Sequence, residues 1–141
     1  DSKDKIIDYY AGVGAIGLSV GAQELVESNR EAVEYAKINI TLNKIKAEAV
    51  CSSSERMIDL ITADKTIILD PPRAGLDKMV VEKILTEKPK KIIYMSCNLA
   101  TQARDLGLLK NSYNIKFAKL YNFFPRTPHF EGLVVLEVKN K

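Results

Sequence analysis

The sequence predicts an α/β fold, a doubly wound and mostly parallel seven-stranded sheet that ends in an antiparallel hairpin. Short apolar runs alternate with segments of helical period as far as Lys110, which is typical of repeated β-α units around a parallel sheet. After Tyr113 two apolar runs follow with no helix-length segment between them, which predicts the hairpin. The turn after the first apolar run has the G-x-G-x-x-G spacing found in nucleotide-binding sheets.

Five strands are expected before the hairpin, at residues 6–10, 24–27, 47–51, 66–70 and 91–96. Helices are expected near residues 15–20, 53–60, 78–87 and 100–110, each after a small, polar or proline-containing turn. A further helix is placed by Ala32, Ala36 and Ile40, which fall four residues apart, with Ser28 or Asn29 as its N-cap. The hairpin strands are expected at residues 115–123 and 133–138. Five parallel strands and a hairpin give the layout of the Rossmann-like class I methyltransferase fold.

Length and composition limit the remaining possibilities. The 141 residues fit one domain over residues 1–141, and 46% hydrophobic with 28% charged residues excludes a disordered chain. No apolar run is long enough to cross a bilayer and no signal peptide begins the chain, so we expect a cytoplasmic protein with no membrane contact. The net charge of +3 permits a polyanionic partner without requiring one. Because the chain starts at Asp1 and enters a strand by Ile6, we expect it to be a domain of a longer protein.

The glycine turn is the first candidate site. Gly12 and Gly14 allow the backbone to curve tightly and approach a ligand, although a strand-to-helix turn needs such glycines without any ligand. Glu27 ends the second strand, where acidic residues of nucleotide-binding α/β folds accept hydrogen bonds from ribose hydroxyls. The other interpretation of Glu27 is a solvated surface residue.

The segment Asp70-Pro71-Pro72-Arg73 follows the fourth strand. Open α/β sheets place their ligands at this edge. The two prolines cannot continue a strand or a helix, so they hold the chain extended beside the site. A rigid loop explains the prolines but not an aspartate at the ligand-facing edge, which favours a functional role for Asp70.

The two cysteines are too few for a disulfide scaffold and lack the spacing of a metal site, so no metal is expected. Cys51 lies in an apolar strand and is expected to be a small buried hydrophobe. Cys97 ends the fifth strand just before a helix, whose N-terminal dipole favours a thiolate. Cys97 is therefore a candidate nucleophile, at the same edge as Gly12, Glu27 and Asp70.

The hairpin loop supplies two candidate partners for this thiolate. His129 is the only histidine, and Glu131 is a candidate base in an aromatic-rich loop. Loop packing and turn hydrogen bonds are the other interpretation of both residues, and they explain His129 equally well.

Together these motifs resemble the catalytic domain of the RNA uracil-C5 methyltransferases, which make 5-methyluridine in tRNA and ribosomal RNA with S-adenosylmethionine. The resemblance covers nearly the whole chain in the family's order. It rests on residues 8–14 (DYYAGVG), 70–73 (DPPR), 96–98 (SCN) with 103–106 (ARDL), and 124–131 (FPRTPHFE).

The resemblance implies a covalent mechanism. The cysteine matching Cys97 attacks C6 of uracil, which makes C5 nucleophilic enough to take the methyl group, and the glutamate matching Glu131 then removes the C5 proton. The cofactor-binding positions match Tyr10, Gly12, Gly14, Glu27 and Asp70. Asp70 and Arg73 match positions that meet a flipped-out base. The implied partner is tRNA or 23S-type ribosomal RNA.

This chain also departs from the family pattern. Leu99 replaces the usual proline, Ser53 stands where an acid often contacts adenine, and the stretch from Gly17 to Glu27 is a few residues short. The family's upstream RNA-binding regions, including a glutamine of the cofactor site, lie outside the sequence, so we expect the chain alone to be poorly active.

Three alternatives differ in class. In a nicotinamide-dependent dehydrogenase, Glu27 would come too soon after Gly12, and Cys97 and Glu131 would have no role. In an adenine amino-methyltransferase, an aromatic residue would stand at Arg73. A non-catalytic RNA- or cofactor-binding module would have no use for Cys97 and Glu131, so their presence favours an enzyme.

Overall fold

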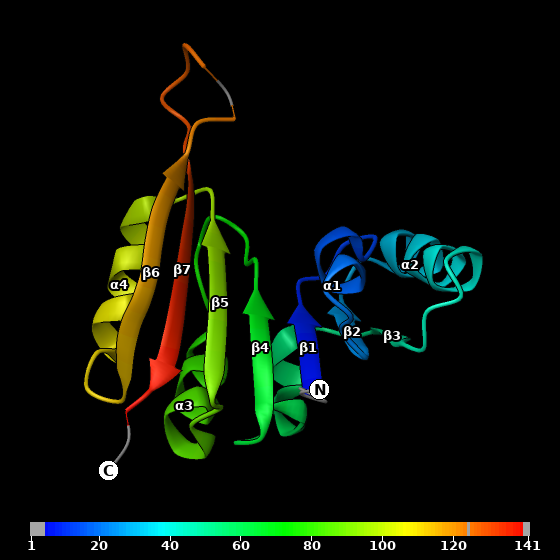
Figure 1. The fold of residues 1–141 in the computed structure, drawn as a ribbon, viewed down its shortest axis with the longest axis horizontal. Helices are drawn as coiled ribbons and strands as arrows, with labels where there is room; N and C mark the ends of the chain where they lie inside the picture. Colours follow the sequence, from blue (N-terminus) through cyan, green and yellow to red (C-terminus); the bar gives the residue numbers. More distant parts are fainter. Residues whose placement is uncertain (1–4, 124, 140–141) are drawn as a thin grey trace.

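The computed structural model describes residues 5–123 and 125–139, and within them the predicted sheet is confirmed (Figure 1). Asp1 and Phe124, on which parts of the sequence interpretation depend, lie outside the described residues. The strands are β1 (Lys5–Tyr9), β2 (Glu24–Glu27), β3 (Glu48–Cys51), β4 (Lys65–Leu69), β5 (Lys91–Ser96), β6 (Tyr113–Tyr121) and β7 (Glu131–Val138). Their order is β3-β2-β1-β4-β5-β7-β6. The first five strands pair in parallel, and β7 pairs antiparallel with both β5 and β6.

Four α-helices connect the strands, namely α1 (Ala15–Ser19), α2 (Arg30–Leu42), α3 (Lys78–Glu87) and α4 (Leu99–Leu109). Side-chain caps fix where three of them begin. Asn29, one of the two expected caps, accepts from the Ala32 amide at 3.1 Å at the start of α2. Asp77 caps α3, and the Asn98 side chain accepts from two amides in the first turn of α4. Leu99 is thus the first helical residue, a position at which proline and leucine are both accommodated.

The two sides of the sheet are covered differently. Alternate strand residues, including Tyr9, Leu69 and Tyr94, are buried in the main core with Val80 and Ile84 of α3. Residues that pair with each other across neighbouring strands have their side chains on the same side of the sheet. The register of β1, β4, β5, β7 and β6 therefore places one row on the other side, made by Asp8, Ile68, Ile93, Val135 and Phe117.

That row runs from buried to exposed. Asp8 and Ile68 are buried near α1, whereas Ile93 and Val135 are half-buried and Phe117 is exposed. Figure 1 shows α1 and α2 at the β1–β3 end of the sheet and α4 at the β6–β7 end. The hairpin end therefore presents an apolar sheet surface to its surroundings.

Two expectations were wrong. Residues 53–60 form two short 3₁₀ turns, η1 (Ser54–Arg56) and η2 (Ile58–Leu60), in place of one α-helix. The Met57 carbonyl accepts from the Leu60 amide and from the Tyr9 hydroxyl, so an α-helical bond is replaced by a tighter turn and a tertiary contact. Cys51 is exposed because β3 is an edge strand with a single neighbour.

Within the described part of the chain, none of the helices has the length and apolar character needed to cross a membrane.

Candidate active site

The candidate residues gather at the edge of the sheet where the parallel strands end. Tyr10, Glu27 and Asp70 stand at or just after the ends of β1, β2 and β4. Cys97 follows β5, and Glu131 begins the antiparallel β7. Because β7 runs opposite to β5, its start lies at the same edge as the end of β5.

The glycine turn bends sharply after β1. Tyr10, Gly12 and Gly14 all have positive φ angles, of 63°, 55° and 84°. A Cβ on Gly14 would lie 2.8 Å from Leu25 Cδ2 and 2.9 Å from Leu18 Cδ1, so this position also needs glycine for space. Gly14 therefore serves close packing of α1 on the sheet, and the hollow that it lines is separate from that of Tyr10 and Glu27.

Glu27 is tied into the turn by its own carboxylate. Oε2 accepts from the Gly12 amide at 2.9 Å, and Oε1 accepts from the Asn29 amide at 2.7 Å and from the Ser28 hydroxyl at 3.3 Å. A carboxylate has about four acceptor positions. Glu27 thus holds the turn and α2 in place and keeps acceptor capacity for a ligand.

A hollow of about 440 Å³ lies between the glycine turn and the segment after β4. It is lined by Tyr10, Val26, Glu27, Ser28, Ser52, Ser53, Ser54, Glu55, Asp70 and Pro72. Sequence reasoning did not identify Ser54 and Glu55 as lining residues. Ser54 Oγ lies 2.9 Å from the Tyr10 hydroxyl and hydrogen-bonds to it. The available signal was a polar run directly after β3, at the same strand-end edge.

Asp70 lies between this hollow and the hairpin. Burial raises the pKa of Asp70, and the negative charge of Glu131 raises it further. The β4–β5 register pairs Leu69 with Tyr94, so Asp70 follows β4 beside the last residues of β5. The electrostatic effect of Glu131 on Asp70 links the hollow to the β5–β7 end.

Cys97 and Glu131 are brought together by strand pairing. Ser96 of β5 pairs with Gly132 of β7 in antiparallel register. Cys97 follows Ser96 and Glu131 precedes Gly132, so the two residues each lie one step beyond this pair, at the same edge of the sheet. Sequence alone does not give this register.

A second hollow, of about 420 Å³, lies around Cys97. Its lining residues are Arg73, Cys97, Asn98, Leu99, Ala100, Pro128, His129 and Phe130. Arg73 Nη2 lies 3.1 Å from His129 Nδ1. Since a guanidinium only donates, Arg73 donates this bond and His129 Nδ1 accepts it. The hollow therefore has a thiol on one side and a cation positioned by the hairpin loop on the other.

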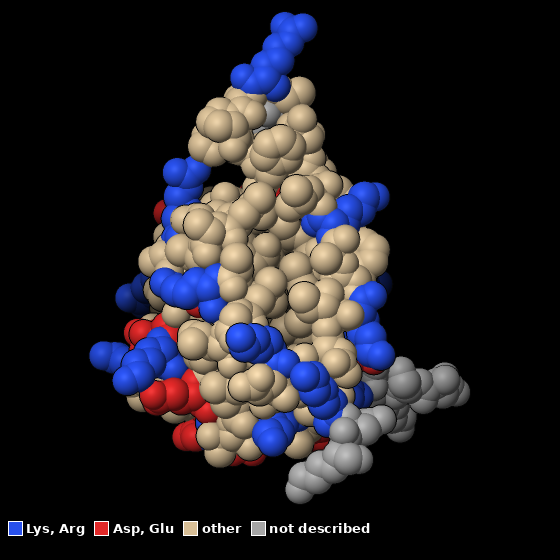
Figure 2. Space-filling view, turned by 90° about the vertical axis from the view of Figure 1, so that its left-hand side faces the viewer, with Lys and Arg blue, Asp and Glu red and all other residues tan. Residues whose placement is uncertain are grey.

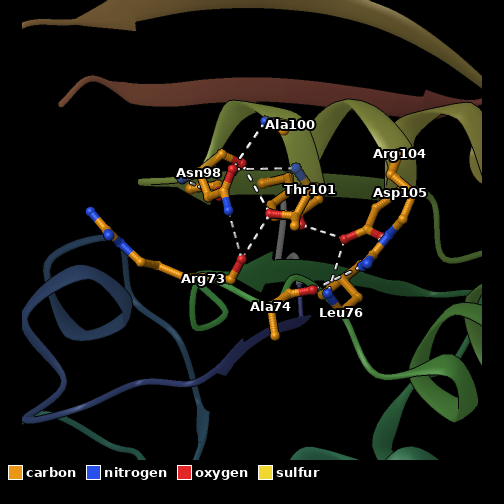
Figure 3. A network of polar contacts seen from close by, with 10 residues as sticks. Arg73, Ala74, Leu76, Asn98, Ala100, Thr101, Arg104 and Asp105 are labelled. Atoms are coloured by element: carbon orange, nitrogen blue, oxygen red, sulfur yellow. Dashed lines mark hydrogen bonds and ion pairs between the residues drawn. The ribbon is translucent and has the colours of Figure 1, made fainter. Parts of the chain in front are cut away.

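The loop after Asp70 is held by hydrogen bonds from α4 and the residue before it (Figure 3). Asn98 Nδ2 and Thr101 Oγ1 both donate to the Arg73 carbonyl, at 2.9 and 3.1 Å. Further along, buried Asp105 accepts from the Leu76 amide at 2.9 Å. In Figure 3 the Arg73 side chain extends away from this network, so its backbone is fixed while its guanidinium is left to face the hollow.

Asp8 is a buried acid under the glycine turn. Its Oδ2 accepts from the Gly17 amide at 2.9 Å, and its Oδ1 has no hydrogen-bond partner. The pKa of Asp8 is raised to about 7, and burial is the largest cause. The hydrogen bond from Gly17 lowers this pKa, and the negative charges of Asp70 and Glu27 contribute to its rise. Asp8 was not singled out from the sequence, because an acid in a strand gives no sign of its burial.

Within the described ranges, no cluster of histidine, cysteine and acidic residues is placed to hold a metal ion.

This architecture defines a class of protein. Five parallel strands, a glycine turn after β1 and an antiparallel β7 inserted between β5 and β6 make the class I methyltransferase fold. The match to a family model described as tRNA (Uracil-5-)-methyltransferase then covers residues 1–139. The chain belongs to this family.

Individual relatives agree with the family match. An uncharacterised RNA methyltransferase of Mycoplasma mobile is 40% identical over 146 residues, covering 98% of this chain and 40% of the relative. The tRNA (uracil(54)-C(5))-methyltransferase of Pyrococcus abyssi is 39% identical over 132 residues, covering 91% of this chain and 32% of that protein.

The crystal structure of the Pyrococcus abyssi enzyme, solved in complex with S-adenosyl-L-homocysteine, superposes with a TM-score of 0.85. In that superposition the identity is 36%, and 96% of this chain and 34% of that chain are covered. The chain thus spans well under half the length of these relatives.

Proposed function

We propose that this chain is the catalytic domain of an enzyme that methylates C5 of uracil in tRNA or ribosomal RNA through a covalent cysteine adduct. One observation carries the proposal. Strand pairing brings Cys97 and Glu131 to the same edge, beside the hollow that contains Tyr10, Glu27 and Asp70.

The residues of the first hollow fit S-adenosylmethionine. Glu27 retains one of its about four acceptor positions for a ribose hydroxyl, and the sharp turn at Gly12 leaves open space where a Cβ would stand. Tyr10 offers an aromatic ring whose hydroxyl is fixed by Ser54, and Asp70, which lines the hollow, would offer a carboxylate to the positive charge of the cofactor. When bound, the cofactor supplies an electrophilic methyl group.

The second hollow fits a uracil turned out of its strand. Cys97 Sγ, as a thiolate, forms a bond to C6 of the ring. The π electrons of the C5=C6 bond move toward C5 and the C4 carbonyl oxygen, which makes C5 nucleophilic. Arg73, positioned by its bond to His129, donates to a carbonyl oxygen of the ring as negative charge develops there.

Glu131 completes the reaction as general base. After C5 has taken the methyl group, Glu131 accepts the C5 proton. As the electrons of the C–H bond re-form C5=C6, the C6–S bond breaks and Cys97 leaves with that electron pair as a thiolate. The strand register supports this assignment, because Cys97 and Glu131 each lie one residue beyond the Ser96–Gly132 pair.

The test compares the two cysteines of the chain in the full-length protein. Cys97→Ser is expected to abolish methyl transfer from labelled S-adenosylmethionine to uridine-containing RNA. Cys51→Ser is the matched control, because Cys51 is exposed on the edge strand β3 and is expected to leave the rate unchanged.

The same experiment separates an enzyme from a non-catalytic module. If Cys97→Ser methylates RNA at the rate of the unmodified protein, the covalent mechanism is wrong. If neither the unmodified protein nor any variant transfers a methyl group while RNA still binds, the chain belongs to a binding module.

A further inference from the structure

Three side chains form a ladder at the end of β6. Lys119 and Tyr121 share one face of this strand, and Phe123 lies two residues after the strand ends. Lys119 is exposed and Tyr121 is half-buried. The rings of Tyr121 and Phe123 stack with centroids 5.5 Å apart and an angle of 7° between their planes. Lys119 Nζ lies 5.0 Å from the centroid of the Tyr121 ring. Phe123, which ends the ladder, is 61% exposed.

The ladder adjoins the proposed catalytic edge. Tyr121 pairs with Glu131 in the β6–β7 register, so their side chains lie on the same side of the sheet. In the same register Lys119 pairs with Leu133 and Phe117 pairs with Val135. The ladder therefore passes beside the proposed general base, with Lys119 toward the apolar sheet surface described above and Phe123 on the side of the hairpin loop.

The charges around the ladder suit a polyanion. Lys119 belongs to it, and exposed Arg126 lies in the same loop three residues after Phe123. The acidic Glu137 at the far end of β7 is neutralised by Lys91 at 3.4 Å and Lys116 at 3.9 Å. Figure 2, which faces the β6 and α4 side of the molecule, shows uncharged side chains bordered by Lys and Arg, with Asp and Glu gathered toward one lower corner.

Strand pairing with a second copy fits this edge poorly. The β6–β7 register is irregular between Ile115 and Phe117, and Lys116 and Lys119 stand on the edge strand itself. Bulges and lysines on an edge strand oppose the addition of another strand. Flat exposed rings interleaved with cations are, by contrast, the composition of single-stranded nucleic-acid sites.

We propose that Lys119, Tyr121 and Phe123 form a stacking platform for an unpaired nucleotide of the RNA next to the target uridine. This inference rests on the proposed function, and it adds a defined subsite to it. A base stacks on the exposed face of Phe123, and Lys119 pairs with a backbone phosphate. A duplex hides its base faces, so the platform selects unpaired RNA.

The test measures binding of a short, labelled, uracil-free oligoadenylate strand to the full-length protein by fluorescence anisotropy, with a duplex as the second ligand. Because the strand has no uracil, capture of the target base does not contribute. Phe123→Leu keeps an apolar side chain but removes the ring, and it is expected to weaken single-strand binding roughly 5- to 100-fold with little effect on the duplex. Tyr35→Leu, at another exposed aromatic residue on α2, is the matched control.

A salt series tests the cation separately. The slope of log affinity against log salt is negative, and Lys119→Gln is expected to make it less negative by about 0.7, whereas Phe123→Leu leaves it unchanged. The platform is refuted if Phe123→Leu binds the strand as tightly as the Tyr35→Leu control, or if it loses duplex binding equally. The proposed function is tested separately, by the methylation rate of Cys97→Ser. A failure of the platform therefore appears in strand binding, and a failure of the proposed function appears in methylation.

Discussion

Replacing Asp8 with asparagine is expected to stabilise the fold at alkaline pH. Asp8 is 1% exposed, and its Oδ1 has no hydrogen-bond partner. Burial raises its pKa from 3.8 to about 7. The folded state thus holds the Asp8 proton more tightly than the unfolded state does.

The sign and size of the effect follow from this difference. Between pH 4 and pH 7 the folded chain binds more protons at Asp8 than the unfolded chain, so this group's contribution to stability falls as pH rises and stays low above pH 7. A pKa difference of about 3 corresponds to about 4 kcal/mol. Asp8→Asn removes the cost of ionising a buried carboxyl group, because asparagine carries no charge. Its amide nitrogen takes the place of Oδ1, where it finds no hydrogen-bond partner, and this costs about 1–3 kcal/mol. The net gain at pH 8 is about 1–3 kcal/mol.

Urea unfolding of the chain and of Asp8→Asn across pH 4–8 measures this effect. The difference in unfolding free energy between the two proteins should favour the variant increasingly as pH rises. Asp59→Asn is the control, since the Asp59 side chain is 95% exposed and should change stability by less than about 0.5 kcal/mol. A difference between Asp8→Asn and the parent that stays constant with pH would refute the assignment of a raised pKa to Asp8.

Three further substitutions test the turn, the loop support and the cofactor hollow. Gly14→Ala is expected to lower the unfolding free energy by about 1–3 kcal/mol, because Gly14 has a positive φ and a Cβ there would press on Leu18 and Leu25. Gly107→Ala is the control, because Gly107 lies in open space within α4 and alanine there should raise the unfolding free energy slightly. Urea unfolding measures both variants. Asn98→Ala and Asn29→Ala each remove a helix cap worth about 1 kcal/mol. Only Asn98→Ala also removes one of the two hydrogen bonds to the Arg73 carbonyl, so only this variant should lower the methylation rate. Glu27→Ala should weaken S-adenosylmethionine binding roughly 10- to 100-fold, as measured by calorimetry. Glu31→Ala is the control, because Glu31 is exposed in the first turn of α2 and should not affect binding. If the two variants bind the cofactor with equal affinity, Glu27 does not belong to the cofactor site.

Local sequence patterns predicted most of the fold. The four-residue spacing of apolar side chains placed α2, and β2, β5 and α3 have the expected bounds. The 3₁₀ turns after β3 were not predictable, because they depend on a hydrogen bond from Tyr9, which is 48 residues from Met57 in sequence. The exposure of Cys51 depends on β3 lying at the sheet edge, which is a property of strand order.

The candidate site was predicted as a set of residues but not as a geometry. Strand ends placed Glu27, Asp70 and Cys97 at one edge, because parallel strands share their direction. The position of Glu131 beside Cys97 required the antiparallel register of β5 and β7, which no local pattern encodes. The support of the Arg73 backbone by Asn98 likewise joins residues 25 positions apart.

The most direct test of the covalent mechanism is the mass of Glu131→Gln protein after incubation with S-adenosylmethionine and uridine-containing RNA. With the base removed, the C5 proton stays and the C6–S bond cannot break readily. We predict a covalent protein–RNA complex that carries one added methyl group, survives denaturation and disappears when Cys97→Ser is combined with Glu131→Gln. Rapid turnover by Glu131→Gln without an accumulated complex, or a complex that persists without Cys97, would contradict the mechanism.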